Sequence, residues 1–454
     1  MTVSRLSPVR CCLTVVRRIA MGVSQHSTWT QGQRSSIIMV IVIMGVLLIM
    51  SSYSGLLTNP LSHRFFARDR YIYGIIFDAG STGSRIHVFK LLPGKPHKLV
   101  DDLFVQVKPG LSAYEKDPKK AAESLVDMLE RAKHYIPATH WSTTPMALKA
   151  TAGLRALPAK AADDILNEVS KLFMTYPFKT SKDSVQIMEG NDEGIFSWVT
   201  VNFLSGNMGD AERMMGVVDL GGGSMQISFI PRHNTTLKSS PSKYITRLNL
   251  MGKSFQLYTH SYLGLGLMSG RLQTLGGVLE TGKASGPKIL TSSCLPSSAK
   301  GTWTQNGVEY SLSGKVVTGD RFDACYMQAK KVIASQVHQP AEVKDKTFCL
   351  ISYYYDRAVE SGLIRSERGG ILKVADFTGA ARNACKADTV DESRQFMCVD
   401  LSYISALLQE GFGFSSDTLV ELKKKIHGTE ISWALGAMLS LLDQRDESHP
   451  ATGG

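Results

Sequence analysis

The chain carries two copies of one local pattern, in which an apolar strand ends in Asp-x-Gly and turns back into a second strand. The first copy, residues 72–91, reads IYGIIFDAGSTGSRIHVFKL, and the second, residues 216–230, reads GVVDLGGGSMQISFI. Asp78 and Asp219 stand 141 residues apart, and apolar residues of the returning strands keep this offset. An internal duplication of this kind predicts two similar lobes, each of which supplies one Asp-Gly turn to a shared cleft.

Segments around the two copies complete an α/β pattern. Short apolar runs predict buried strands over residues 145–150 and 184–188. Residues 281–318 are rich in Gly, Ser and Lys, and we expect loops or hairpins there. Periodic apolar residues predict helices over 118–136, 159–174, 320–339, 400–410, 416–427 and 429–442. We expect lobe I to span 71–205 with 429–445, and lobe II to span 206–428.

The N-terminal region predicts a membrane anchor. Residues 37–57 are uncharged, which is near the ~20 residues that a helix needs to cross hydrocarbon. Residues 1–36 contain five arginines and no acid, so we expect a cytosolic basic tail and a type II single-pass orientation. Residues 58–70 would then form a stem. A cleaved signal peptide, which would release a secreted form, is the alternative because small residues follow the apolar run.

Composition and charge exclude several classes of protein. Apolar residues make up 43% and charged residues 20%, which excludes disordered, collagen-like and polytopic membrane chains. The net charge is +11, and five of the cations lie in the basic tail, so nucleic-acid binding is not indicated.

Disulfides are allowed beyond a membrane. Asn234 begins the one Asn-x-Ser/Thr sequon, where a glycan would fit that compartment.

The two Asp-Gly turns have the composition of phosphate-binding loops. Glycines let backbone N–H groups approach an anion, and hydroxyls add further donors. Asp78 and Asp219 end their strands, where carboxylates suit a divalent cation held through water. An unliganded hairpin turn is the alternative for either loop alone, but two copies in phase favour a clamp on nucleotide phosphates. The candidate phosphate contacts are Ser81, Thr82, Gly83, Ser84 and Arg85 in the first loop, and Gly221, Gly222 and Gly223 in the second.

Three further segments carry candidate site residues. KATAGLR, at residues 149–155, offers Thr151, and MEGNDEG, at 188–194, offers the acid Glu193. SWALGAM, at 432–438, begins with Ser and Trp433 before a helical pattern. Each has a purely structural alternative: a strand-to-helix turn, an acid serving the helix dipole, and a core tryptophan, respectively.

The two Asp-Gly turns and the three further segments, taken in their order along the chain, resemble the five apyrase-conserved regions of the ecto-nucleoside triphosphate diphosphohydrolase (apyrase) family. The resemblance spans about residues 72–442, and KPGLSAY, YTHSYLGLGL and SYYYDRAV are similar to its nucleoside diphosphatase branch. It implies an actin-like (ribonuclease H-like) duplicated two-lobe fold with the nucleotide in the cleft. It also implies Ca²⁺ or Mg²⁺ as cofactor, and a Golgi membrane or cell-surface location, or a shed form. We expect a monomer.

The resemblance further implies a role for each matched residue. Glu193 matches the general base, and Ser224 and Gln226 match residues that hold the attacking water. Asp78, Asp219, Thr151 and Trp433 match the shell that holds the metal through waters. Cys294 is expected to pair with Cys325, and Cys385 with Cys398. Gly223 and Met225 depart from the residues usual in the family, and strand alternation predicts that Met225 points away from the phosphate.

The implied reaction is metal-assisted hydrolysis of the terminal phosphate of GDP, IDP or UDP in preference to triphosphates. Tyr353, Tyr354 and Tyr355 are candidates to stack on the base, although an aromatic core strand is equally compatible with them. Two rival functions remain at this point: a small-molecule kinase of the same superfamily, and a catalytically silent nucleotide-binding membrane protein.

Overall fold

The computed structural model describes residues 39–40, 43–44, 71–280, 283–285, 288–305, 307–365, 368–388 and 394–448. The predicted basic tail, the stem and nearly all of the predicted anchor lie outside these residues. Within the described ranges, no helix is both long enough and apolar enough to cross a membrane. The compact unit that carries the two Asp-Gly turns begins at Tyr71.

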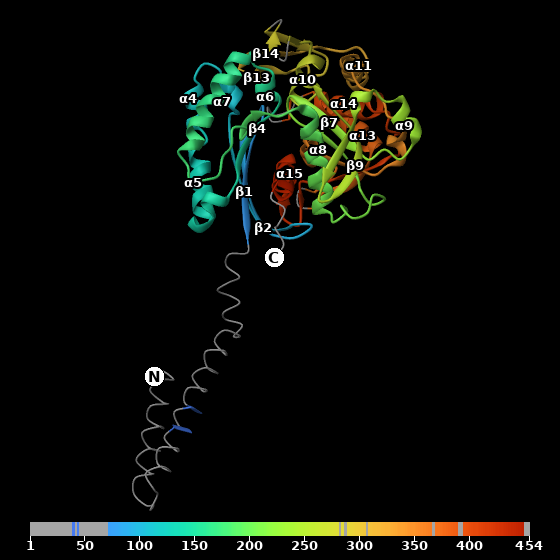
Figure 1. Cartoon of the computed structure of the whole chain (residues 1–454). Helices are drawn as coiled ribbons and strands as arrows, with labels where there is room; N and C mark the ends of the chain where they lie inside the picture. The colour runs from blue at the N-terminus through green and yellow to red at the C-terminus, as the bar shows by residue number, and fades with distance from the viewer. Residues whose placement is uncertain are drawn as a thin grey trace, which may run out of the picture. The chain divides into compact units, whose positions relative to one another are not determined.

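Lobe I is built on a five-stranded sheet of order β3-β2-β1-β4-β5. Its strands are β1 (Ile72–Ala79), β2 (Ser84–Leu92), β3 (Lys98–Val107), β4 (Met146–Ala150) and β5 (Val185–Ile187). Helices α4 (Pro118–Glu123), α5 (Val126–Tyr135) and α7 (Ala159–Met174) cover the outer face (Figure 1). Ile75 and Phe77 of β1 join this outer core, whereas Ile76 faces the opposite core, as the period of two requires.

Lobe II is built on a seven-stranded sheet of order β16-β17-β15-β6-β7-β9-β8. Its strands are β6 (Gly216–Leu220), β7 (Ser224–Phe229), β8 (Ile245–Leu250), β9 (Lys253–Leu263), β15 (Phe348–Ser352), β16 (Gly370–Lys373) and β17 (Leu419–Leu422). Its main helices are α10 (Leu267–Thr274), α11 (Arg321–Ile333), α12 (Tyr353–Glu360), α13 (Val374–Cys385) and α14 (Met397–Ala406). The largest apolar core lies between these helices and the sheet.

Two helices, α8 (Gly190–Leu204) and α15 (Trp433–Ser448), join the lobes. They pack against each other, with α15 against β1 and α8 against β6, β7 and β9 (Figure 1). Gly436 permits this close approach because a Cβ there would collide with the backbone oxygen of Phe196, and its N–H donates to Thr200 Oγ1 at 2.8 Å. The shared core therefore contains side chains from both sheets.

The topology confirms the duplication. The order β3-β2-β1-β4-β5 in lobe I is matched by β9-β7-β6-β15-β17 in lobe II, with β8 and β16 added at the edges. In each set the strands of the hairpin, β1 with β2 and β6 with β7, pair antiparallel. The remaining neighbours, β1-β4-β5 and β6-β15-β17, pair parallel. Asp78 pairs with Arg85 across its hairpin, and Asp219 pairs with Gln226 across the other. The predicted two-lobed α/β fold is therefore present.

Several expected elements differ from those observed. The helix predicted over 416–427 is wrong, because Val420 and Leu422 are buried alternately in β17, which pairs parallel to β15. The 118–136 helix divides after α4, where Ser124 Oγ donates to Ala121 O at 2.6 Å. α11 ends at Ile333 instead of 339, and α15 begins at Trp433 after β19 (Thr429–Glu430).

Five short strands lie in, or just before, the segment predicted as loops or hairpins. They are β10 (Val278–Glu280) and β11 (Lys283–Ser285), which pair with each other, followed by β12 (Ile289–Ser292), β13 (Lys300–Gln305) and β14 (Val308–Gly314). The expected disulfides are both present, Cys294–Cys325 between this segment and α11, and Cys385–Cys398 between α13 and α14. Cys349 of β15 is a buried free thiol.

Candidate active site

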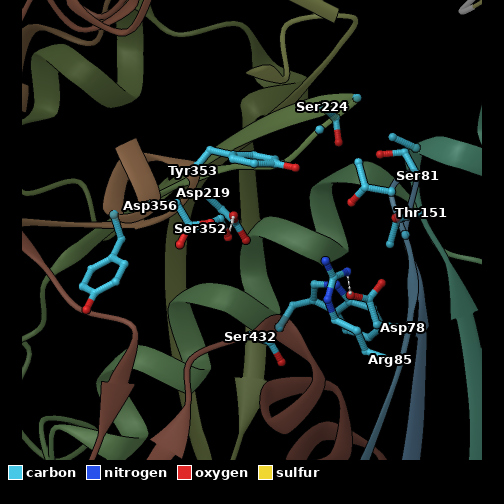
Figure 2. Close-up of a pocket in the computed structure, with 18 of the residues that line it drawn as sticks. Asp78, Ser81, Arg85, Thr151, Asp219, Ser224, Ser352, Tyr353, Asp356 and Ser432 are labelled. Carbon is cyan, nitrogen blue, oxygen red and sulfur yellow. Dashed lines mark hydrogen bonds and ion pairs between the residues drawn. The ribbon is translucent and has the colours of Figure 1, made fainter. Parts of the chain in front are cut away.

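The two Asp-Gly hairpins face one cavity of about 590 Å³ between the lobes. We call residues 80–83, between β1 and β2, hairpin I, and residues 221–223, between β6 and β7, hairpin II. A backbone hydrogen bond closes each hairpin: Gly80 N donates to Gly83 O, and Gly221 N donates to Ser224 O, both at 3.0 Å. Asp78 and Asp219 line the same cavity, on opposite sides in Figure 2.

Glycines set how closely the two hairpins approach each other. A Cβ on Gly222 would lie 2.8 Å from Ser81 Oγ and 3.0 Å from Thr82 Cγ2 of the opposite hairpin. A Cβ on Gly223 would lie 3.0 Å from Ala152 Cβ. Met225, the next residue but one, is fully buried in the core of lobe II, as its position in the strand predicted. The hairpins thus form facing walls of the cavity, to which Ser81 and Thr82 bring hydroxyl groups and the glycines bring backbone N–H groups.

Each hairpin also packs against a glycine from another segment, which no sequence motif indicated. A Cβ on Gly110 would collide with Gly80 O of hairpin I. On the other side, a Cβ on Gly266 would lie 2.5 Å from Ser224 N and 2.6 Å from Gly222 C. These neighbours are backbone atoms, so no side-chain rotation relieves the overlap.

Gly266→Ala is therefore expected to displace hairpin II and lower kcat/KM for phosphate release roughly 100-fold, because a shift of about 1 Å in a positioned group costs that much. Gly209→Ala is the matched control, since a Cβ there meets nothing within 4 Å. Steady-state kinetics of both variants give the comparison, and equal rates would show that hairpin II tolerates the displacement.

The two hairpin carboxylates are buried and differently held. Arg85 Nη1 donates to Asp78 Oδ2 at 3.1 Å, while Asp78 Oδ1 is buried with no hydrogen-bond partner. Burial raises the pKa of Asp78, Arg85 opposes the shift and nearby Asp219 adds to it. Asp219 accepts from Ser352 Oγ at 2.6 Å and from Ser197 Oγ at 2.9 Å, and burial raises its pKa also. A buried carboxylate oxygen that has no hydrogen-bond partner, with a second carboxylate lining the same cavity, suits a bound cation.

Glu193 lies in the first turn of α8, within a polar network. Arg155 Nη2 donates to Glu193 Oε2 in a short ion pair, and Gln226 Nε2 donates to the same oxygen at 3.2 Å. Gln226 Nε2 also contacts Ser224 Oγ at 2.8 Å and Ser261 Oγ at 3.0 Å.

Burial raises the pKa of Glu193 to about 8, an effect that Arg155 opposes and Asp219 and Asp78 increase. A carboxyl with a pKa near neutrality is suited to proton transfer.

Thr151 and Trp433 line the same cavity, Thr151 between β4 and α6 (Ala152–Arg155) and Trp433 at the start of α15. Within the described parts of residues 71–448, no three Asp, Glu, His or Cys side chains gather into a metal-binding cluster. A cation between Asp78 and Asp219 would therefore complete its shell with water and phosphate, as Mg²⁺ commonly does.

The three tyrosines occupy the start of α12 and differ in direction. Tyr353 and Tyr355 line the cavity, whereas Tyr354 is fully buried and packs edge-on against Phe377 at 6.4 Å between centroids. Tyr354 therefore does not line the cavity, and its segment is a helix instead of the alternative aromatic strand. Phe396, which no sequence pattern indicated, also lines the cavity.

Ser352 is a second residue that sequence patterns did not reveal. Its backbone has φ 60° and ψ −126°, a conformation that a residue with a Cβ rarely adopts. This conformation lies at the junction of β15 and α12, and it brings Ser352 Oγ to Asp219 (Figure 2). The strain is therefore located where lobe II orients its cavity-facing carboxylate.

A family model covers almost the whole compact unit. Residues 66–451 match the model of the GDA1/CD39 (nucleoside phosphatase) family. The chain belongs to this family. The expected resemblance and the enzyme class, a hydrolase of nucleotide phosphoanhydrides, are thereby confirmed.

Relatives at high identity support the same assignment. The chain is 46% identical to human nucleoside diphosphate phosphatase ENTPD5 over 383 residues, 83% of this chain and 89% of the relative. It is 45% identical to human ectonucleoside triphosphate diphosphohydrolase 6 over 375 residues, 82% and 77% of the two chains. A solved structure of nucleoside triphosphate hydrolases from Neospora caninum aligns with a TM-score of 0.62 at 14% identity. The alignment covers 88% of this chain and 97% of that one, and it supports the fold.

Proposed function

We propose that this family member removes the terminal phosphate of nucleoside diphosphates, with GDP, IDP and UDP preferred and triphosphates hydrolysed more slowly. The convergence of hairpin I, hairpin II and the Glu193 network on one cavity carries the proposal. Ser81, Thr82 and Arg85 line the cavity, and their donors, with the backbone of hairpin II, would surround the phosphate chain from both sides. Gly83 and Ser84, which were also predicted to contact phosphate, are buried and do not line it.

Glu193 is the proposed general base. Gln226 Oε1 is buried without a hydrogen-bond partner, so it is available to accept a hydrogen bond from a water that also donates to Glu193. With Ser224 Oγ beside Gln226, that water would be oriented toward the terminal phosphorus. Proton transfer to Glu193 accompanies attack on phosphorus, the bond to the bridging oxygen breaks, and the nucleoside monophosphate and inorganic phosphate leave.

Enzymes of this family depend on a divalent cation. Asp78 and Asp219, with Thr151 and Trp433 nearby, are the residues that would hold Ca²⁺ or Mg²⁺ through waters. Once bound, the cation would offset negative charge on the phosphate oxygens. The ion would supply a positive charge near Asp78 Oδ1, which has no hydrogen-bond partner. It would also stabilise the charged form of both aspartates, whose pKa values burial raises.

We further propose a lumenal or extracellular location, in a Golgi-membrane, cell-surface or cleaved secreted form. The two disulfides support an oxidising compartment. Asn234 is exposed at the start of α9 (Asn234–Ser239), where a glycan would fit. Clearing diphosphates left by glycosyl transfer is a role suited to that compartment.

Phosphate release from GDP, IDP, UDP, ADP and ATP tests the function directly. We expect release from the diphosphates with Mg²⁺ or Ca²⁺, slower release from ATP, and none with excess EDTA. A kinase would instead transfer phosphate from ATP to an added acceptor, and a silent binding protein would release none. Either result would contradict the proposal.

A further inference from the structure

The end of the cavity away from hairpin I carries a charged pair that the proposed chemistry does not use. Arg357 and Glu360, both on α12, line this end, and Arg357 Nη1 lies 2.5 Å from Glu360 Oε2. Figure 2 places Tyr353 and Asp356 of the same helix across the cavity from Asp78 and Ser81. The pair is therefore separate from the groups that face the phosphates.

Arg357 has hydrogen-bonding capacity that the protein leaves unused. Its Nε is buried and has no hydrogen-bond partner. Its Nη1 lies 3.5 Å from Asp400 Oδ2, but Arg271 already holds Asp400 through two bonds, from Nε at 2.8 Å and from Nη2 at 2.6 Å. Nη1 also lies 3.5 Å from Met397 Sδ. The fold thus pairs Asp400 without Arg357, and the unpartnered Nε on a residue of the cavity wall makes Arg357 a candidate to bind an acceptor on a ligand.

Aromatic side chains flank this pair. Tyr353 and Tyr355 precede it on α12, and Phe396 lines the cavity beside it, with its ring 4.1 Å from the guanidinium carbon of Arg271. A flat base placed between such rings presents its edge, and not its face, to groups at the rim. Arg357 and Glu360 are a donor and an acceptor that line the same cavity as these rings.

We propose that Arg357 and Glu360 determine base specificity by binding the edge of a nucleobase that carries a carbonyl beside a ring N–H. This inference rests on the proposed function, since it concerns the substrate of the same cavity. Arg357 would donate to the carbonyl oxygen, and Glu360 would accept from the ring N–H. Guanine, hypoxanthine and uracil all carry this pair of groups.

Adenine and cytosine carry the opposite pattern, an amino group beside an unprotonated ring nitrogen. Against Arg357 and Glu360 they would set donor against donor and acceptor against acceptor. Sites built to hydrogen-bond a substrate reject analogues that leave their buried polar groups unpaired. The pair therefore selects GDP, IDP and UDP against ADP and CDP.

The test is a base panel on the full chain, with kcat/KM measured for GDP, IDP, UDP, ADP and CDP. Ribose 5-diphosphate is included because it has the sugar and both phosphates but no base. Arg357→Met is expected to lower kcat/KM for the three carbonyl bases roughly 10- to 100-fold, the usual effect of losing a hydrogen bond from a charged group. Glu360→Gln supplies an N–H where adenine presents a ring nitrogen, so it should raise the ADP-to-GDP ratio about tenfold or more.

Glu410→Gln is the matched control for Glu360. Glu410 pairs with Lys330 at 2.8 Å outside the cavity, and its side chain is 37% exposed, against 46% for Glu360. It should leave the order of bases unchanged. All variants should hydrolyse ribose 5-diphosphate at the native rate, which excludes misfolding as the cause of any change.

The outcomes separate the two proposals. If the native enzyme releases phosphate from none of these diphosphates, the proposed function fails. If it hydrolyses them but ADP equals GDP, or if both variants keep the native order of bases, only the specificity inference is overturned. A matching loss with ribose 5-diphosphate would also overturn it, because the pair would then act on the sugar or phosphates.

Discussion

Replacing Glu193 with glutamine is expected to lower kcat for phosphate release about 100- to 10,000-fold while leaving nucleotide affinity within a few-fold of native. Glutamine has the same shape and keeps an acceptor for Arg155 and Gln226, so the network around it should persist. It cannot take a proton from water. The loss should therefore appear in kcat, measured by phosphate release, and not in nucleotide binding, measured by calorimetry.

Glu189→Gln provides the control for this experiment. Glu189 lies four residues earlier, at the N-cap of α8, and is exposed to solvent. The same change of charge there should leave kcat near the native value. A Glu193→Gln enzyme with near-native kcat would contradict the assignment of the base.

Replacing Asp219 with asparagine is expected to have the second largest effect, through the cation. The variant loses one of the two carboxylates that would hold the ion's waters, while Ser352 and Ser197 remain able to bond its side chain. The Mg²⁺ or Ca²⁺ concentration that gives half-maximal activity should rise roughly 10- to 100-fold. Activity titrated with each cation measures the shift.

Asp417→Asn is a suitable control, since Asp417 is exposed and pairs with Lys373 at 2.9 Å away from the cavity. It removes the same charge from the protein but should leave the cation requirement unchanged. If Asp219→Asn titrates like the native enzyme, the cation does not bind where we propose.

The duplicated Asp-Gly turns made the centre of the site predictable from the sequence. Their constant offset placed Asp78 and Asp219 at equivalent strand ends, and the paired hairpins reproduce that register. Strand alternation likewise placed Met225 in the core. These features depend on local patterns, which a sequence records directly.

Features that depend on contacts distant in the sequence were not predictable. Ser352 contacts Asp219 across 133 positions, and Gly266 supports hairpin II from a separate segment. Residues 416–427 looked helical, but pairing with β15 makes Leu419–Leu422 a strand. Arg357 and Glu360 lie in an ordinary helical sequence, and only the fold shows that they line the same cavity as the two hairpins. Tertiary packing, more than local propensity, decides such cases.

A crystal structure with Mg²⁺ and a non-hydrolysable analogue of GDP tests the central claim most directly. We predict a terminal phosphate contacted by both hairpin I and hairpin II, a cation linked through water to Asp78 and Asp219, and a water between Glu193 and Gln226. A diphosphate bound by one hairpin alone, or in a cavity that does not contain Glu193, would contradict the account.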